Sequence, residues 1–232
     1  MVAGVATEQQ HMLNDDSGEK PAVQHPRLSA VGTVEDEDLQ FVVRTYPHLL
    51  QGPECQALIA LAEKIGVSRS GVQTTQDPSD RHSFDAKIGI MDCVGTFYSE
   101  NAAGCDALRK VYGYMTTISG FPSSHMEPVS LVRYEVGQYF SAHEDRFPVD
   151  SPEIKILGSQ RTMSMLLYLN NVEEGGETQF IDINLRIVPE EGKSLVWKNT
   201  PSTRHESSIV KRGVKWVAVM FIHDRELPRN FL

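Results

Sequence analysis

The stretch VSLVRYEVGQYFSAH, at residues 129–143, decides the fold class. It holds two runs of β-branched and aromatic residues on either side of a Gly-containing turn, which indicates two short strands. Further runs of this kind follow along the chain: TMSMLLYLN (162–170), ETQFI (177–181), LRIV (185–188), KSLVW (193–197) and VKWVAVMFI (214–222). Many short strands divided by turn residues are typical of a β-sandwich or barrel.

Helical patterns precede this strand-rich region. A helix is predicted to open at Gly52-Pro53, where the first turn tolerates proline, and to end at Gly66. A second helix is predicted over residues 101–118, and a strand over residues 39–44. Helices followed by strands predict an α+β fold in which the helices pack on one side of an antiparallel sheet.

The segment from Gly66 to Asp92 is polar and rich in Gly, Ser, Thr and Asp. It is long for a connection without structure of its own. We therefore expect either a functional loop or a hairpin that closes over a site, and a lid is the natural role for it.

The acidic residues are concentrated at the N-terminus. The chain has 232 residues and a net charge of −9, while its first 38 residues contain eight acidic and two basic side chains. This predicts a flexible acidic tail at 1–38 and one globular domain at 39–232. The acidic balance argues against a nucleic-acid partner, and the lack of a long apolar run argues against a membrane span.

The three cysteines, Cys55, Cys93 and Cys105, include no CxxC pair, and the chain opens without a secretory-signal pattern. A sparse, odd number of cysteines is typical of a reducing compartment. We therefore predict no disulfide and a cytoplasmic location.

A candidate metal site starts from His143 and Asp145, which an extended chain would place on the same face. A third ligand is needed, and His205 and His223 lead because they lie in the same strand-rich region. Two histidines and one aspartate would leave positions open on Fe(II), as in oxygenases that bind an organic acid and O2. A buried dianion such as 2-oxoglutarate would then require a buried cation, for which Lys215 is well placed.

Four stretches carry a family resemblance. They are LVRYEVGQYFSAHED (131–145), RTMSMLLYLNNVEEGGETQF (161–180), VPEEGKSLVW (188–197) and the run from His205 to Trp216. With them the region from about Val129 to Ile222 resembles the prolyl 4-hydroxylase family of Fe(II)/2-oxoglutarate dioxygenases. The resemblance implies a double-stranded β-helix, or jelly roll, backed by helices.

The resemblance also implies a reaction and a set of roles. The family hydroxylates an unactivated C–H bond with Fe(II), O2 and 2-oxoglutarate, releases succinate and CO2, and uses ascorbate as a candidate reductant. Carried over by position, the iron ligands are His143, Asp145 and His205; Lys215 pairs with the 2-oxoglutarate C5 carboxylate, and Tyr134 and Thr178 are its hydroxyl partners.

This chain departs from the family pattern at two places. Glu206-Ser207-Ser208-Ile209-Val210 stands where relatives usually have Gly and Pro-Val after the distal histidine, and Phe221 stands where Trp is frequent. Because of these two changes, the resemblance does not determine the identity of the substrate. Arg161 is the candidate for gripping a substrate carboxylate or carbonyl, with a surface ion pair as the alternative.

Several functional alternatives remain at this stage. We expect a proline-like amino acid or a prolyl residue as substrate, and a different free amino acid or small metabolite is the alternative. The same three ligands could hold zinc in a hydrolase, although Lys215 and Thr178 would then have no role. A non-catalytic protein that binds small molecules is the remaining reading. The oligomeric state is not predicted.

Overall fold

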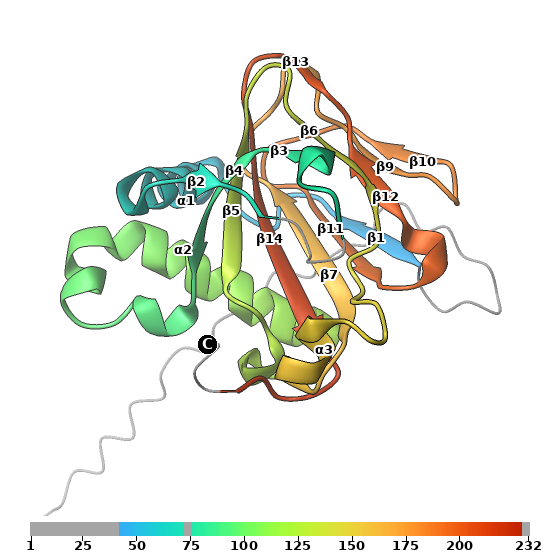
Figure 1. Ribbon diagram of the computed structural model, residues 1–232. Coiled ribbons are helices and arrows are strands. Elements are labelled where there is room, and N and C mark those ends of the chain that lie inside the picture. The colour runs from blue at the N-terminus through green and yellow to red at the C-terminus, as the bar shows by residue number, and fades with distance from the viewer. Residues whose placement is uncertain (1–41, 72–75, 229–232) are drawn as a thin grey trace, which may run out of the picture.

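The computed structural model describes residues 42–71 and 76–228, and its centre is two antiparallel β-sheets (Figure 1). The larger sheet has the strand order β1 (Val43–Tyr46), β11 (Ser194–Lys198), β7 (Arg161–Tyr168), β14 (Lys215–His223), β5 (Val129–Tyr134), β4 (Phe84–Ile88) and β2 (Ser68–Arg69). The smaller sheet has the order β10 (Leu185–Ile187), β9 (Thr178–Phe180), β12 (His205–Ser207), β6 (Tyr139–His143) and β3 (Arg81–His82). A two-stranded pair, β8 (Glu174–Gly175) and β13 (Val210–Arg212), lies at one end.

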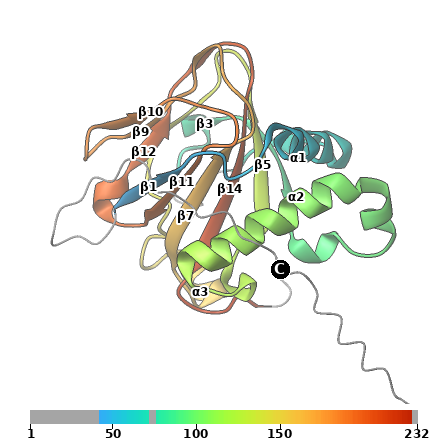
Figure 2. The same ribbon diagram turned by 180° about the vertical axis from the view of Figure 1, so that it is seen from behind.

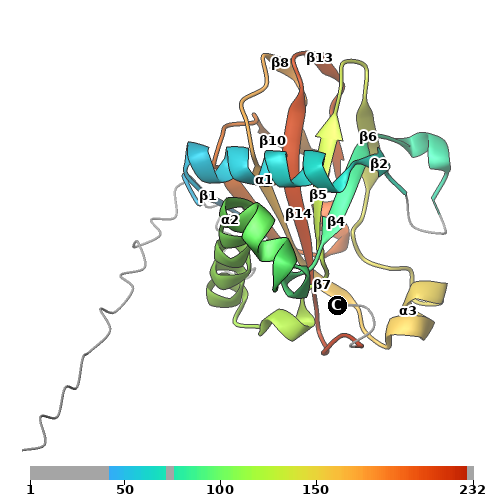
Figure 3. The same cartoon turned by 90° about the vertical axis from the view of Figure 1, so that its left-hand side faces the viewer.

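Helices α1 (Gly52–Ile65) and α2 (Thr96–Ser119) cover one face of the larger sheet (Figures 2 and 3). A short helix, α3 (Pro152–Leu157), lies at the end away from β8 and β13. Single 3₁₀ turns complete the element set: η1 (Pro78–Asp80), η2 (Ile90–Asp92), η3 (Ser123–His125) and η4 (Pro201–Thr203).

Strand β14 shows how period-2 alternation builds two cores. Ala218 and Met220 belong to the cluster that packs against α1 and α2, while Val217 belongs to the cluster between the sheets. Because both faces are covered, the strand reads as a nearly continuous apolar run. Lys215 is the exception in this run, and its side chain lies on the face between the sheets.

The observed architecture confirms the predicted α+β jelly roll. Helix α1 has its predicted bounds, whereas α2 begins at Thr96, earlier than expected, and has non-helical backbone angles at Asn101. The predicted strand at 39–44 is found at Val43–Tyr46. Its first residues, the acidic tail at 1–38 and the proposed domain start at 39 lie outside the described residues.

The described part of segment 66–92 adds strands to both sheets. Within it β2 pairs with β4 at the edge of the larger sheet, and β3 pairs with β6 at the edge of the smaller one. The expectation of a hairpin is therefore confirmed for its described part. Closure of this segment over a substrate stays a prediction.

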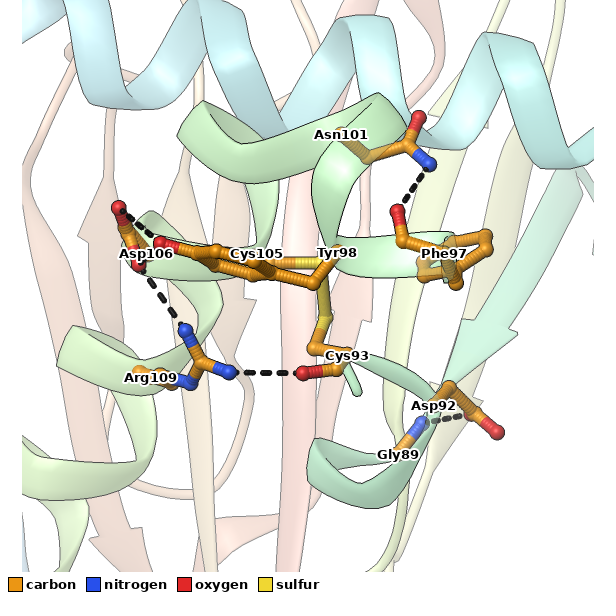
Figure 4. Close-up of a disulfide and its surroundings, with 9 residues drawn as sticks. All are labelled: Gly89, Asp92, Cys93, Phe97, Tyr98, Asn101, Cys105, Asp106 and Arg109. Carbon is orange, nitrogen blue, oxygen red and sulfur yellow. Dashed lines mark hydrogen bonds and ion pairs between the residues drawn. A yellow bond between two sulfur atoms is a disulfide. The ribbon is translucent and has the colours of Figure 1, made fainter. Parts of the chain in front are cut away.

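Cys93 and Cys105 form a disulfide, with their Cα atoms 5.4 Å apart (Figure 4). It ties the turn after β4 to helix α2, and Arg109 of that helix donates a hydrogen bond of 2.7 Å to the Cys93 carbonyl. The prediction of no disulfide is therefore wrong. The two cysteines are 12 positions apart, so only the fold of α2 against the preceding turn brings them together. The cytoplasmic location used the same argument and stays a prediction.

In the described part of the chain, every helix is too short or too polar to cross a membrane.

Candidate active site

Three potential metal ligands meet on the inner side of the smaller sheet. His143 ends β6 and His205 begins β12, and the two residues are direct partners across these antiparallel strands. Asp145 follows two positions after His143. One ligand atom from each residue lies within 4.8 Å of the other two, and His143 Nε2 is 3.6 Å from Asp145 Oδ1. The arrangement has the size that a single metal ion requires.

Both imidazoles are oriented by backbone carbonyls. His143 Nδ1 lies 2.8 Å from the Ser141 carbonyl oxygen, and His205 Nδ1 lies 3.0 Å from that of Thr203. Because a carbonyl can only accept, each Nδ1 carries the proton and each Nε2 keeps its lone pair. Both Nε2 atoms face Asp145, at 3.6 and 3.9 Å from its oxygens. A metal-binding histidine needs this outer contact to fix its tautomer.

The charge states also suit a metal. Burial lowers the pKa of His205 to about 4, so its imidazole is neutral near pH 7. Burial alone would raise the pKa of the Asp145 carboxyl, but the adjacent His205 and His143 lower it below its ordinary value. Two neutral nitrogens and one carboxylate oxygen form the donor set that non-haem Fe(II) takes in oxygenases, so these residues fit iron.

A small cavity of about 70 Å³ lies beside the three ligands, and it contains a buried cation. Lys215 is 1% exposed and donates a hydrogen bond of 2.7 Å to Ser207 Oγ. Among the described residues no carboxylate forms an ion pair with it. Burial lowers the pKa of Lys215 to about 7. A bound carboxylate would stabilise its charged form, so the cavity fits an organic anion such as 2-oxoglutarate.

The hydroxyl groups of Tyr134 and Thr178 belong to residues of the same cavity wall. Tyr134 is the partner of Lys215 across β5 and β14, and Lys215 Nζ lies 5.1 Å from the centre of its ring. The Thr178 hydroxyl accepts a hydrogen bond of 2.7 Å from Tyr168. It therefore keeps its own hydrogen for a ligand.

Gly175 and Gly176 lie next to this cavity wall, where neighbouring atoms leave little space for a side chain. Gly175 pairs with Val210 in the two-stranded β8–β13 pair, where a side chain would collide with the Ile209 carbonyl. Gly176 has a φ of +71°, and a Cβ there would lie 3.2 Å from Lys215 Cδ. The tight backbone at Gly176 thus leaves space for the buried lysine stem.

A second cavity, of about 330 Å³, shares His143 and Asp145 with the first. Arg161 lines it and binds both oxygens of Glu127, at 2.5 and 2.9 Å. Its guanidinium lies 4.3 Å from the ring centre of Phe147 and 3.7 Å from that of Phe221. This cavity is larger than the first and borders the metal ligands, and we call it the groove.

His223 lies behind this groove and not at the metal site. It is fully buried, its Nε2 is 2.8 Å from a Glu127 oxygen, and its Nδ1 is 2.7 Å from the Ser159 hydroxyl. Burial alone would raise the pKa of Glu127, but Arg161 and His223 lower it to about 2. Glu127 is therefore a buried carboxylate compensated from two sides, and His223 is excluded as the third ligand.

The structure brings the sequence-predicted residues together in two adjoining cavities. His143, Asp145 and His205 form one cluster, with Tyr134, Thr178 and Lys215 on the neighbouring wall. Arg161 is close by, but it forms a partly buried ion pair instead of a surface one. Sequence reasoning missed Glu127, because a single glutamate before Pro128 carries no local signal of its distant partner. It also missed Arg81 and Phe140, which line both cavities.

A jelly roll that holds two histidines and one carboxylate next to a carboxylate-binding pocket defines a non-haem iron oxygenase. Comparison with known proteins narrows this class. Residues 129–223 match the model of the 2OG-Fe(II) oxygenase superfamily. Prolyl 4-hydroxylase 13 of Arabidopsis thaliana is 33% identical over 222 residues, which cover 85% of this chain and 77% of the relative. Probable prolyl 4-hydroxylase 9 of the same plant is 28% identical and covers 91% and 81%.

Solved structures show the same fold. The viral collagen prolyl hydroxylase of Paramecium Bursaria Chlorella virus-1, solved with 2OG, has a TM-score of 0.59 at 23% identity, over 78% of this chain and 95% of that one. A prolyl hydroxylase of Trichoplax adhaerens, solved with a peptide fragment, has a TM-score of 0.61 at 15% identity, over 80% and 84%. The chain belongs to the prolyl 4-hydroxylase family of 2OG-Fe(II) oxygenases, and its cofactors are Fe(II) and 2-oxoglutarate.

Proposed function

We propose that this protein hydroxylates a prolyl residue within a peptide. In this proposal His143, Asp145 and His205 hold Fe(II), and Lys215, Thr178 and Tyr134 bind the C5 carboxylate of 2-oxoglutarate. The names of its relatives as prolyl 4-hydroxylases support proline as the reacting unit. The residues of the groove favour a peptide over a free amino acid as the substrate.

The observation that carries the peptide proposal is the pairing of Arg161 with Glu127. A free amino acid would bring its own carboxylate into the groove, and a buried carboxylate needs a cation that is not already compensated. Arg161 has both oxygens of Glu127 within 2.9 Å, so its charge is neutralised inside the protein. The other arginine of the groove, Arg81, also lines the small cavity and donates to the neutral Ser83 hydroxyl and Gly71 carbonyl. It is therefore the neutralised charge of Arg161 that disfavours a substrate carboxylate. A prolyl residue with amides on both sides carries no such charge and suits this groove.

The chain's own residues have clear tasks in this reaction. Bound Fe(II), with 2-oxoglutarate and O2, supplies the oxidising power to hydroxylate an unactivated C–H bond, with release of succinate and CO2. The three metal ligands hold the iron at the point where the two cavities meet. Phe140, Phe147 and Phe221 give the groove an apolar wall that excludes water near the reacting carbon. The Glu127–Arg161 pair fixes a guanidinium edge from which a backbone carbonyl can accept a hydrogen bond.

Turnover of 2-oxoglutarate with different substrates tests the proposal. Iron-loaded protein is given short prolyl peptides, free proline, pipecolate or other free amino acids, and succinate release and product mass are measured. We expect only the prolyl peptides to gain one oxygen atom in step with succinate release. Coupled hydroxylation of a free amino acid, with peptides inert, would refute the peptide assignment. A His143→Ala variant provides the background value.

A further inference from the structure

One side chain of the small cavity has no role in the family pattern. Ser207 stands in the segment where this chain departs from its relatives, two positions after His205. It lines the cavity together with Lys215 and Thr178, and its Oγ accepts the 2.7 Å hydrogen bond from Lys215 Nζ. The only buried ammonium group of this cavity in the described chain is therefore held by a serine that the sequence resemblance did not predict.

The sheet register explains why Ser207 reaches this position. Ser207 on β12 is the direct partner of Thr178 on β9, so the two side chains project from neighbouring strands on the same face. Lys215 approaches from β14 of the opposite sheet. The ammonium group thus meets the Ser207 hydroxyl across the gap between the sheets, and Thr178 lines the same cavity.

The hydrogen bonds already present leave both hydroxyl hydrogens available. The Ser207 oxygen accepts from Lys215, and the Thr178 oxygen accepts from Tyr168 at 2.7 Å. A hydroxyl group that accepts one hydrogen bond can still donate its own hydrogen. Lys215, Ser207 and Thr178 therefore offer three donor groups in the wall of one cavity, which suits the several acceptor sites of a carboxylate.

We infer that Ser207 is an additional binding residue for the C5 carboxylate of 2-oxoglutarate, donating a hydrogen bond beside Lys215 and Thr178. This inference rests on the proposed function, because it assigns the small cavity to 2-oxoglutarate. It makes Ser207 a residue that distinguishes oxo-acids with a distal carboxylate from those without one.

Binding of two ligands to metal-loaded protein without O2 tests the inference. The ligands are 2-oxoglutarate and 2-oxopentanoate, which has the same five carbons and the same keto-acid end but no C5 carboxylate. Affinity is measured by calorimetry, and by the fluorescence change of Trp197, which lines the cavity. We expect Ser207→Ala to weaken 2-oxoglutarate binding by about tenfold or more, the size of a hydrogen bond to a charged group, and to leave 2-oxopentanoate unchanged.

Ser208→Ala is the matched control. Ser208 is the next residue, but its hydroxyl bonds the Glu177 carboxylate and backbone N–H and does not line the small cavity. We expect this variant to bind 2-oxoglutarate within about twofold of the wild type. Thermal unfolding checks that both variants are folded.

The outcomes separate this inference from the proposed function. Equal losses for both ligands, equal losses in Ser207→Ala and Ser208→Ala, or no loss in Ser207→Ala would each overturn the role of Ser207. Wild-type protein that binds neither ligand would refute the proposed function, and the role of Ser207 with it.

Discussion

Each of the two cavities beside the metal ligands has a buried cation in its wall, and the two cations have different neighbours. Lys215 in the small cavity contacts a neutral serine, whereas Arg161 in the groove is neutralised by Glu127. Burial lowers the pKa of Lys215 to about 7, and the negative charge of Glu177 offsets only part of this effect. This difference supports the proposal that the small cavity binds an anion and the groove a neutral group.

In the proposed function, this contrast assigns the co-substrate and the substrate to different cavities by electrostatics. A dianion such as 2-oxoglutarate gains most where a lysine has no carboxylate partner. A peptide segment gains most where the charges are already paired and the wall is aromatic. The metal ligands His143 and Asp145 line both cavities, so they join the two binding sites.

We expect the largest effect from Asp145→Ala, because it removes a candidate metal ligand that lines both cavities. Without the carboxylate, two imidazoles remain, and we expect metal affinity to fall by more than about 100-fold, the upper range for changes behind the ligands. Metal content after dialysis and succinate release measure it. If the variant retained iron and coupled turnover, the three-residue metal site would be wrong.

Lys215→Met tests the small cavity alone. Removing one partner of a buried ion pair costs about 3–5 kcal/mol, so we expect 2-oxoglutarate to bind at least about 100-fold more weakly. The unliganded variant should unfold at a higher temperature than the wild type, because the uncompensated charge is gone. Titration calorimetry and thermal unfolding measure the two effects. A variant with weaker binding and lower stability would show that Lys215 is already compensated.

Glu127→Gln leaves Arg161 of the groove without its carboxylate partner. We expect a loss of about 3–5 kcal/mol in the free energy of unfolding and little change in 2-oxoglutarate affinity. Because folding lowers the pKa of Glu127 from 4.5 to about 2, its stabilisation is complete above pH 4.5 and lost as the pH falls towards 2. Denaturant unfolding across this range measures both effects, and the variant should lack this acid-dependent loss.

Glu135→Gln is the control for that prediction. Its pair with Arg133 is half exposed, so its removal should cost at most about 1 kcal/mol. Equal losses in the two variants would contradict a special role for the Glu127–Arg161 pair.

The pH dependence of 2-oxoglutarate binding tests the ionisation state of Lys215. In the proposed function Lys215 binds the co-substrate in its charged form, and burial lowers its pKa to about 7 in the absence of ligand. Affinity should therefore be constant below pH 7 and fall by about tenfold per pH unit above it, until the pKa of the bound state is reached. Calorimetry from pH 6 to 9 measures this profile. Lys215→Arg keeps its charge throughout and should flatten it; a sloping profile in that variant would point to another group.

The smallest effect is expected from Gly176→Ala. The positive φ costs about 1–2 kcal/mol with a Cβ, and the methyl group would lie 3.2 Å from Lys215 Cδ. We expect 2-oxoglutarate affinity to fall several-fold while the KM for the peptide is unchanged. Gly120→Ala has a similar φ of +75° and no neighbour within 4 Å, so it should lose stability only. The same affinity loss in both variants would mean that contact with Lys215 is irrelevant.

Local patterns were sufficient for the scaffold. Period-2 alternation and turn residues predicted the strands from 129 onward, and Gly52-Pro53 with Gly66 predicted both ends of α1. Such signals work because they act over a few neighbouring residues. Helix α2 was predicted too short, because its first turn lies before the change in backbone angles at Asn101.

These local patterns did not predict which residues far apart in the sequence pair with each other. Arg161 and Glu127 are 34 positions apart, and Cys93 and Cys105 meet only through the packing of α2. The sequence also left His205 and His223 as rivals. The register of β12 against β6 places His205 next to His143, while His223 at the end of β14 is directed to Glu127.

Residue chemistry and short spacing were enough to predict the α+β jelly roll and the donor set of the metal site, and to propose Lys215 as the cation for the co-substrate. Which charges are compensated depends on the packing of segments that are distant in the sequence. Arg161 at the start of β7 pairs with Glu127, which precedes β5 of the same sheet, whereas β12 of the smaller sheet brings Ser207 to the ammonium of Lys215 on β14. Since the free energy of a buried charge depends on its immediate neighbours, this difference supports the proposal that the small cavity binds an anionic co-substrate and the groove a neutral substrate.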